Sequence, residues 1–280
     1  MSKIVRILRR IALGAIVPAA LVGVWHVASQ RSLVVPGIPE TLEVFVHAFR
    51  RPTDLDSAAL ATSAAVSILR VLCGFALAVL TGIPVGLMIG GSRTLREIFA
   101  PVISGATAIS PIAWIPVAII VFGFASPATA LFGRNHWQHD LLDQLRFAII
   151  AVIWYGGFFP IVVNTAAGVS AVRRSHVEVV RVLGGSRWDV LRRVVLPSAA
   201  PSIVTGLRLG AGIAWRVIIA AEIFPGTRSG VGYMIAVAGQ MNEYRYVFAN
   251  IIVIAVIGVS IDALLYLAAR RVGRWQEMQR

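Results

Sequence analysis

Six long apolar stretches restrict the fold of this chain more than any other feature of its sequence. A membrane-spanning helix needs about 20 mostly apolar residues, because the hydrocarbon core is about 30 Å thick and a helix rises about 1.5 Å per residue. Backbone groups in a bilayer must pair within their own segment, which favours helices. The chain is 58% hydrophobic and 14% charged, and we expect an all-α integral membrane protein with six transmembrane helices. The predicted spans are 11–28, 66–90, 99–124, 145–170, 198–224 and 247–269.

Several prolines lie inside these predicted spans, and four of them are candidate break points. Pro84 is in the second span, Pro111 and Pro116 are in the third, and Pro160 is in the fourth. Proline lacks a backbone N–H and clashes with the preceding helical turn. We therefore expect these helices to be broken where the backbone faces protein or a water-lined cavity rather than lipid. Simple kinking for packing is the alternative.

Basic residues gather in alternate connections between the spans. The N-terminal tail, the loops 91–98 and 171–197, and the tail from residue 270 together carry a net charge of +12, whereas the other three loops together carry −1. Positively charged loops stay in the cytoplasm, which predicts that both termini and the loop 171–197 are cytoplasmic. An even number of spans also requires both termini on one side.

The strongly basic composition allows other interpretations, which we disfavour. A net charge of +13 can indicate a nucleic-acid partner, but these arginines cluster at the ends of apolar segments, so we expect no nucleic-acid binding. The first 29 residues could be a cleaved signal peptide. Their apolar run exceeds a usual signal core, and Trp25 and His26 make a poor cleavage end, which favours a retained anchor helix. The lone Cys73 is expected to pack among apolar residues, with no zinc site.

The arginine-rich loop 171–197 is the most informative segment. Its apolar residues recur at helical spacing, Gly184 and Gly185 would end one short helix, and Ser186 can cap a second. Pro197 marks the entry to the next span. These features predict two short helices joined by a tight turn at the cytoplasmic surface. Such a loop could lie on anionic lipid headgroups, act only as a topology signal, or dock a cytoplasmic partner.

This loop resembles the signature segment of permease subunits of binding-protein-dependent ABC importers. That signature reads Glu-Ala-Ala, three residues, Gly, nine residues, Ile, one residue and Leu-Pro. Glu178 takes the acidic position, Gly184 falls at the glycine, and Val194 replaces the isoleucine. Leu196 and Pro197 complete the pattern at the same spacing. The departures from the signature exchange one apolar residue for another.

Further phrases extend the resemblance over most of the chain. They are TGIPVGLMIGGS (81–92), ISPIAWIPVAIIVFG (109–123), FFPIVVNTAAGV (158–169), TGLRLGAGIAW (205–215) and AAEIF (220–224). Within the family, the likeness is to importers of nitrate, sulfonates, taurine, cyanate or bicarbonate. It implies a MetI-like type I ABC importer permease fold. The implied divisions are an N-terminal anchor helix (1–30), an external loop (31–65), a core of five spans (66–270) and a cytoplasmic tail (271–280).

The resemblance also implies partners. The chain has no GxxxxGK[ST] phosphate-binding motif, and Lys3 is its only lysine, so we expect no ATP hydrolysis in this chain and no cofactor. ATP and Mg²⁺ would belong to two cytoplasmic ATPase subunits. The other implied partners are a second permease copy in a homodimer, an extracytoplasmic substrate-binding protein and the lipid of a bacterial cytoplasmic (inner) membrane. The residues expected to couple this chain to the ATPase are Glu178, Arg181, Gly184, Gly185, Ser186, Arg187, Leu196 and Pro197.

Ionisable residues inside spans are costly and often functional, and four stand out here. Arg208 and Glu222 fit family phrases, and we expect them in structural pairing or gate support. Asp262 lies in the last span. Arg216 stands where the family usually has an apolar or small residue. Its charge could attract an anion into the path, or it could form a salt bridge with the second copy.

Pro111, Trp114 and Pro116 could break the third span near the midplane and form a path or gate, although packing in lipid or in the core would also explain the tryptophan. Together with Arg216 and Glu222, they are the candidate path residues.

The segment 133–146 departs from the family pattern and leaves the cargo open. Its charged and histidine side chains are Arg134, His136, His139, Asp140 and Asp143. They could suggest a metal site, but we expect a solvated external loop and no metal. The first hypothesis is a permease for a small inorganic or organic anion. An importer of another small nutrient is the alternative within transport. An intramembrane enzyme is disfavoured, because no paired acids or histidines lie at one depth.

Overall fold

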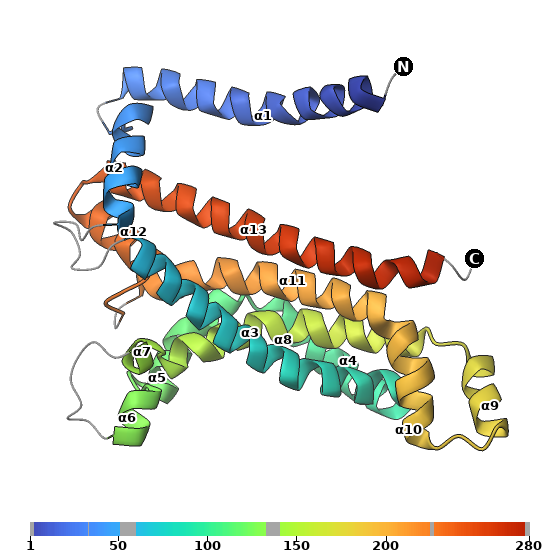
Figure 1. The fold of residues 1–280 in the computed structure, drawn as a ribbon. Helices are drawn as coiled ribbons and strands as arrows, with labels where there is room; N and C mark the ends of the chain where they lie inside the picture. Colours follow the sequence, from blue (N-terminus) through green and yellow to red (C-terminus); the bar gives the residue numbers. More distant parts are fainter. Residues whose placement is uncertain (1–2, 33, 51–59, 133–140, 225–226, 278–280) are drawn as a thin grey trace.

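The computed structural model describes residues 3–32, 34–50, 60–132, 141–224 and 227–277, and these residues form helices and short connections without strands (Figure 1). Six helical stretches within them are long and apolar enough to cross a membrane, as predicted. These stretches are Leu13–Arg31, Leu60–Gly91, Pro111–Ala130, Phe147–Ser170, Arg187–Ile223 and Tyr244–Arg270.

The elements follow one another along the chain without long irregular connections in the described part. In order they are α1 (Lys3–Arg31), α2 (Ile38–Arg50), α3 (Leu60–Gly91), α4 (Arg93–Ala108), η1 (Pro111–Trp114), α5 (Ile115–Phe122), α6 (Pro127–Phe132), α7 (Leu141–Gln144), α8 (Phe147–Ser170), α9 (Arg174–Val182), α10 (Arg187–Val190), η2 (Leu191–Val195), α11 (Leu196–Ile223), α12 (Val231–Gln240) and α13 (Tyr244–Glu277).

Helices α3, α8 and α11 form the centre of the bundle. Glycines bring their backbones together: a Cβ added at Gly74 of α3 would lie 2.7 Å from Cβ of Ile153 in α8. A Cβ added at Gly210 of α11 would lie 2.9 Å from the carbonyl oxygen of Gly157 in α8. Lipid supplies no hydrophobic force between helices, so close packing of small residues is what holds such a bundle together.

The predicted third span is wrong at its start. Residues 99–108 belong to α4, which begins at Arg93, and the helix ends before Ser110. Pro111 begins a 3₁₀ turn, and Pro116 lies in the first turn of α5. The break has a local cause, because Pro111 cannot donate a backbone hydrogen bond to the preceding turn. The candidate span therefore runs from Pro111 to Ala130.

The other two prolines do not break their helices, contrary to the sequence prediction. Pro84 lies inside the 32-residue helix α3, and Pro160 lies inside the 24-residue helix α8. Each removes one N–H donor, which a long helix packed among neighbours tolerates. The Pro160 carbonyl accepts a hydrogen bond from Nδ2 of Asn164 at 2.8 Å.

The predicted loop 31–65 contains helical structure. Helix α2 occupies residues 38–50, and α3 begins at Leu60 rather than at residue 66. The acidic residues of α2 and the serines and threonine at the start of α3 lower the local hydropathy, which hides both helices from a span search. Val44 of α2 and Leu60 of α3 are buried together against α12 and α13.

Helix α1 stands apart from the bundle over most of its length (Figure 1). None of its apolar window is buried. At its C-terminal end, the Trp25 ring stacks on Phe248 of α13 with ring centroids 5.5 Å apart, and its Nε1 donates to the carbonyl of Pro36 at 3.1 Å. Among the described side chains of α1, Trp25 therefore attaches the C-terminal part of the helix to the rest of the chain.

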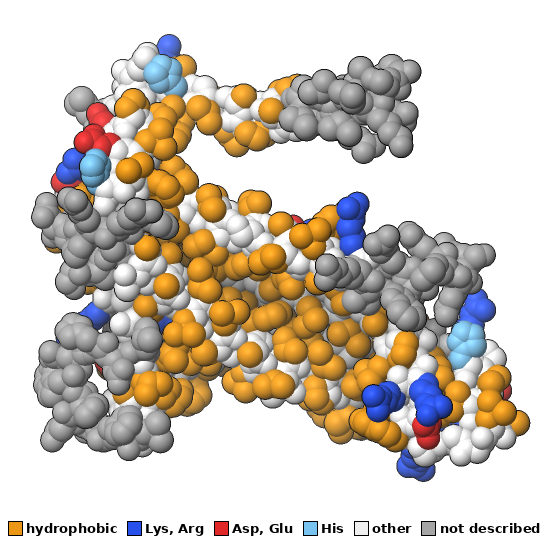
Figure 2. Space-filling model, in the orientation of Figure 1, with side chains coloured by type: hydrophobic (Ala, Val, Ile, Leu, Met, Phe, Trp, Pro, Cys, Tyr) orange, Lys and Arg blue, Asp and Glu red, His pale blue; other side chains and the backbone are white. Residues whose placement is uncertain are grey.

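The two ends of the molecule differ in what they carry. Figure 1 shows the start of α1, the end of α13, the turn between α3 and α4, and the α9–α10 segment at one end of the molecule. Helices α2, α6, α7 and α12 lie at the opposite end. Between these ends, apolar side chains cover much of the visible surface (Figure 2), as expected where lipid or another subunit covers the protein.

Candidate coupling loop and translocation path

Helix α9 ends in the way the two glycines predicted. The Gly184 N–H donates to the carbonyl of Arg181 at 3.0 Å, and the Gly185 N–H donates to the carbonyl of Val180 at 2.9 Å. This pair of bonds is the Schellman arrangement, which needs a residue in the left-handed region after the helix. Gly184 supplies it, with φ of +80°.

The second short helix begins at once after this turn. The Ser186 Oγ accepts from the Asp189 N–H at 3.2 Å, while the Ser186 N–H donates to the Asp189 carboxylate at 3.0 Å. This reciprocal capping box satisfies two helix-end donors. Position 185 leaves no room for a side chain, because a Cβ there would lie 2.8 Å from the carbonyl oxygen of Val180. The predicted helix–turn–helix is confirmed.

The second short helix continues directly into the next span. Helix α10 passes through the π-helical segment η2 into α11, and the Leu196 N–H donates to the carbonyl of Leu191. Pro197 lacks an N–H, so a regular α-helical ladder cannot pass through it. Proline and π-turns are common causes of bends, and Figure 1 shows α10 running across the direction of α11. The predicted entry to the span at Pro197 is thus a bend within one helical stretch, Arg187–Ile223.

The α9–α10 loop presents an apolar surface framed by charge. Val182 is 86% exposed and Leu183 is 80% exposed, which is unusual for such residues. Glu178 is exposed and has no ion pair or hydrogen-bond partner within the described part of the chain. Arg181 and Arg187 are exposed as well. Figure 2 shows basic and apolar side chains gathered at this end of the molecule.

Two of the three path candidates on the third span pack against α8. The Trp114 ring lies 5.5 Å from that of Tyr155, measured between centroids, and the Tyr155 hydroxyl donates to the carbonyl of Ala106 at 2.6 Å. Ala106 is in the last turn of α4, so Tyr155 holds the end of the broken helix. Pro111 is half-buried beside α8, whereas Pro116 is exposed.

Glu222 is fully buried and belongs to an ion pair that the sequence analysis missed. Its Oε1 lies 2.7 Å from Nη1 of Arg70 in α3, and the two side chains are 0% and 1% exposed. Arg70 also donates through Nε to the Gln144 carbonyl at 2.8 Å and through Nη1 to the Ser229 carbonyl at 2.8 Å. The sequence signal for this pair was Arg70 itself, an arginine inside the predicted span 66–90.

Glu222 and Ser67 together cap helix α12 from outside that helix. Helix α12 has no side-chain cap of its own at Gly230. Instead, the Val231 N–H donates to Oγ of Ser67 in α3, and the Gly232 N–H donates to Oε2 of Glu222 in α11, each at 3.0 Å. Carboxylates stabilise helix N-termini because they accept from unpaired N–H groups. Two distant helices therefore fix the start of α12.

Two further charged residues pair near the middle of α11 and α13. Nε of Arg208 lies 2.7 Å from Oδ1 of Asp262, and Nη2 lies 2.8 Å from Oδ2, so the pair is bidentate. Its side chains are 40% and 58% exposed. They line a groove between α11 and α13 with a volume of about 550 Å³. Arg216 lines the same groove and is exposed.

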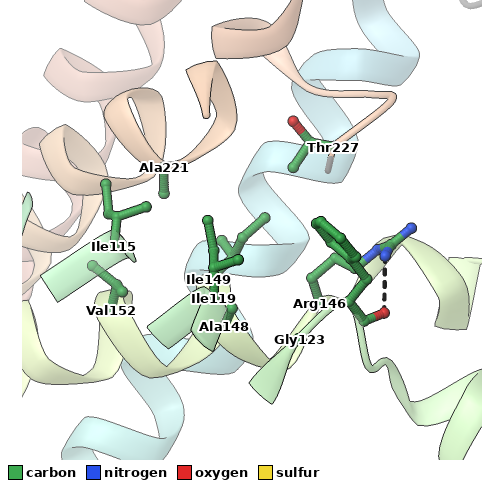
Figure 3. A pocket seen from close by; sticks show the side chains of 10 residues that line it. Ile115, Ile119, Gly123, Arg146, Ala148, Ile149, Val152, Ala221 and Thr227 are labelled. Atoms are coloured by element: carbon green, nitrogen blue, oxygen red, sulfur yellow. Dashed lines mark hydrogen bonds between the residues drawn. The ribbon is translucent and has the colours of Figure 1, made fainter. Parts of the chain in front are cut away.

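An apolar pocket at the opposite end from α9 is too small for a cargo site. Figure 3 shows apolar side chains such as Ile149 and Val152 of α8 facing Ile115 of α5 and Ala221 of α11. Arg146 closes one side, and its Nη1 donates to the carbonyl of Phe124 at 2.8 Å. The free space is about 20 Å³, which fits a single water molecule.

No group of three or more potential metal ligands occurs in the described part of the chain. Most of the predicted insertion, residues 133–140, lies outside the described residues, including Arg134, His136, His139 and Asp140. Asp143 is described, and its Oδ1 accepts from the hydroxyl of Ser126 at 2.9 Å.

Comparison with known proteins places this architecture. Residues 82–274 match the family of binding-protein-dependent transport system inner membrane components. The chain is 32% identical over 270 residues to the taurine transport system permease protein of Escherichia coli (strain K12), which covers 95% of this chain and 90% of that protein. It is 31% identical to the putative aliphatic sulfonates transport permease protein of Bacillus subtilis (strain 168), over 94% of this chain and 87% of that protein.

A cyanobacterial relative matches a shorter region. The bicarbonate transport system permease protein of Synechococcus elongatus is 35% identical over 196 residues, which cover 70% of this chain and 63% of that protein.

Solved structures show the same fold. The inward-facing methionine ABC transporter matches with a TM-score of 0.62 at 14% identity, covering 76% of this chain and 95% of that chain. A bacterial alginate ABC transporter matches with a TM-score of 0.57 at 19% identity, covering 96% of this chain and 93% of that chain. The predicted MetI-like permease fold is confirmed. This chain belongs to the family of binding-protein-dependent transport system inner membrane components and is a multi-pass membrane permease.

Proposed function

We propose that this chain is the transmembrane subunit of an ATP-driven importer in a bacterial cytoplasmic membrane, with both termini and the α9–α10 loop in the cytoplasm. The observation that carries the proposal is the apolar surface at the end of α9, where Val182 and Leu183 are exposed to solvent. A monomeric protein has little reason to keep such a patch in water. Two cytoplasmic ATPase subunits, which bind ATP and Mg²⁺, are the proposed partners, one for each copy of a permease homodimer.

The loop is built to transmit force. Helix α9 is stopped by the turn at Gly184, and the capping box at Ser186 starts a helix that continues into α11. A push on α9 would therefore reach a span without passing through a flexible linker. Arg181 and Arg187 would meet acidic groups on the ATPase, because charge complementarity directs docking. Glu178, Gly185, Leu196 and Pro197 complete the proposed coupling segment.

The coupling role can be tested at Gly184, whose φ of +80° suits Gly and, with little strain, Asn. Gly184→Pro cannot adopt this conformation because proline fixes φ near −65°. We expect Gly184→Pro to lose most of the ATP turnover stimulated by the loaded binding protein in the reconstituted complex, and Gly184→Asn to keep most of it. If Gly184→Pro retains stimulated turnover, the coupling role is wrong.

For the cargo we propose a small inorganic or organic anion, such as nitrate, bicarbonate, a sulfonate or taurine, moved by alternating access between two copies of the chain. The names of the relatives support this class. The proposed path or gate residues are Pro111, Trp114, Pro116, Arg216 and Glu222.

An extracytoplasmic binding protein would select the cargo, so the direct test is calorimetric titration of that protein with each candidate anion. Binding of a neutral or cationic nutrient alone would replace the anion proposal and leave the importer proposal standing.

A further inference from the structure

We infer that the groove between α11 and α13 is a water-filled, anion-selective part of the translocation path, and that Arg216 provides its selectivity. The inference rests on the proposed importer function and adds to it the place in the fold where the anion would bind and the residue that would select it. The ligand class is a small monovalent oxyanion, a carboxylate, sulfonate, nitrate or bicarbonate.

The charges in the groove do not cancel. Arg208 is neutralised by its bidentate contact with Asp262. Arg216 has no acidic partner in the described part of the chain, and its only hydrogen bond there runs from Nε to the Gly212 carbonyl at 3.1 Å. Four of the five N–H donors of its guanidinium are thus free for another partner. Among the residues that line the groove, Arg216 carries the one uncompensated charge.

The position of these residues argues against lipid as the occupant. Arg208 and Asp262 lie near the middle of α11 and α13, and Arg216 lies two turns along α11, about 12 Å further at a rise of about 1.5 Å per residue. An exposed ion pair and an unpaired guanidinium at such depth are costly in hydrocarbon and usually face a water-filled cavity or the interior of a bundle. The groove is also open, with a volume of about 550 Å³.

The geometry of Arg216 favours an oxyanion. Its bond through Nε to the Gly212 carbonyl orients the guanidinium and leaves both terminal nitrogens available. A planar guanidinium edge matches two oxygens of a carboxylate or a related oxyanion, which gives two parallel hydrogen bonds. Gly212 leaves space beside it, since a Cβ added there would meet no atom within 4 Å.

The test measures local charge and does not need the cargo to be known. Cysteine is placed at Gly212→Cys, beside Arg216, and separately at Thr205→Cys in the same groove, about 16 Å from Arg216 along α11. Both variants carry Cys73→Ala to remove the native thiol. The full complex, in membrane fragments open on both sides, is treated with an anionic and with a cationic methanethiosulfonate reagent, and the ratio of the two rates is measured with Arg216 and with Arg216→Gln.

With a free Arg216, the anionic-to-cationic rate ratio at position 212 is higher than at position 205. Arg216→Gln then lowers the ratio at 212 to the level at 205. A unit charge a few ångströms away changes the local concentration of a monovalent reagent several-fold even in water-like surroundings. The two reagents respond in opposite directions, so we expect Arg216→Gln to change the anionic-to-cationic rate ratio at position 212 by about tenfold. In a further measurement, nitrate or methanesulfonate is added and the ionic strength is kept constant with chloride. Either oxyanion should slow the reaction of the anionic reagent at position 212 only when Arg216 is present.

Three results would overturn the inference. In the first, the anionic-to-cationic rate ratios at positions 212 and 205 are equal with Arg216, and Arg216→Gln lowers the ratio at 212. This result means that an acidic residue of the second copy already neutralises Arg216. Absence of labelling at both positions means that the groove is dry. A lack of protection by either oxyanion means that Arg216 does not hold this class of ligand. None of these results depends on ATP coupling, so they are distinct from failure of the proposed function.

Discussion

The buried pair of Arg70 and Glu222 allows a quantitative prediction about stability. Arg70→Met keeps most of the volume but leaves the Glu222 carboxylate without a cation at 0% exposure. The bonds from Arg70 to the Gln144 and Ser229 carbonyls are lost at the same time. Breaking one side of a buried ion pair costs about 3–5 kcal/mol. At about 2–4 °C per kcal/mol for a chain of this size class, the expected fall in apparent Tm is about 10 °C.

The exposed pair of Arg93 and Glu97 provides a matched control. Its side chains are 92% and 67% exposed, at an N–O distance of 2.9 Å. Exposed pairs contribute about 0–1 kcal/mol, so Arg93→Met should shift the Tm by only a few degrees at most. Arg70→Met and Arg93→Met remove the same charge by the same substitution and differ chiefly in burial.

Thermal unfolding in detergent with a thiol-reactive fluorogenic dye is a suitable assay. The single cysteine, Cys73, is partly buried in α3 one turn from Arg70, so the dye reports on the region that the substitution affects. All variants are heated at one scan rate because such unfolding is often irreversible. A Tm for Arg70→Met within a degree or two of the Arg93→Met value would refute the assignment of this pair as a major stabilising contact.

Two further predictions concern packing. A Cβ at Gly86 would lie 2.6 Å from Cβ of Thr165, so Gly86→Ala should cost about 1–3 kcal/mol and lower the Tm, whereas Gly91→Ala, with nothing within 4 Å, should not. Tyr155→Phe removes only the hydroxyl that holds Ala106, which is expected to cost about 1 kcal/mol and to increase hydrogen exchange at the break between α4 and η1. Unchanged exchange there would show that Tyr155 does not hold the broken helix.

Local patterns determined a large part of this structure. The number of spans followed from apolar length, and the turn at Gly184 and Ser186 followed from local residue types. Both depend on interactions within a few residues, and the bonds from Gly185 to Val180 and between Ser186 and Asp189 confirm this. The α9–α10 loop was therefore located, and its helix ends were predicted, from the sequence.

Proline effects were only partly predictable, because they depend on what surrounds the freed backbone groups. Pro111 starts a new helical segment after the end of α4, whereas Pro84 and Pro160 lie inside unbroken helices. All three remove a donor by the same chemistry. The hydropathy pattern also missed α2 and the start of α3, where the hydroxyl residues Thr41 and Ser63 are buried against neighbouring helices.

The charged contacts inside the bundle were decided only by tertiary structure. Arg70 and Glu222 are 152 residues apart, and Arg208 and Asp262 are 54 residues apart. No local periodicity links such positions, because each partner is selected by how α3, α11 and α13 pack. The sequence alone determined how many segments are long and apolar enough to span a membrane and where the turn between α9 and α10 lies. Packing between distant helices decided that Glu222 is buried with Arg70 while Arg216 faces an open groove.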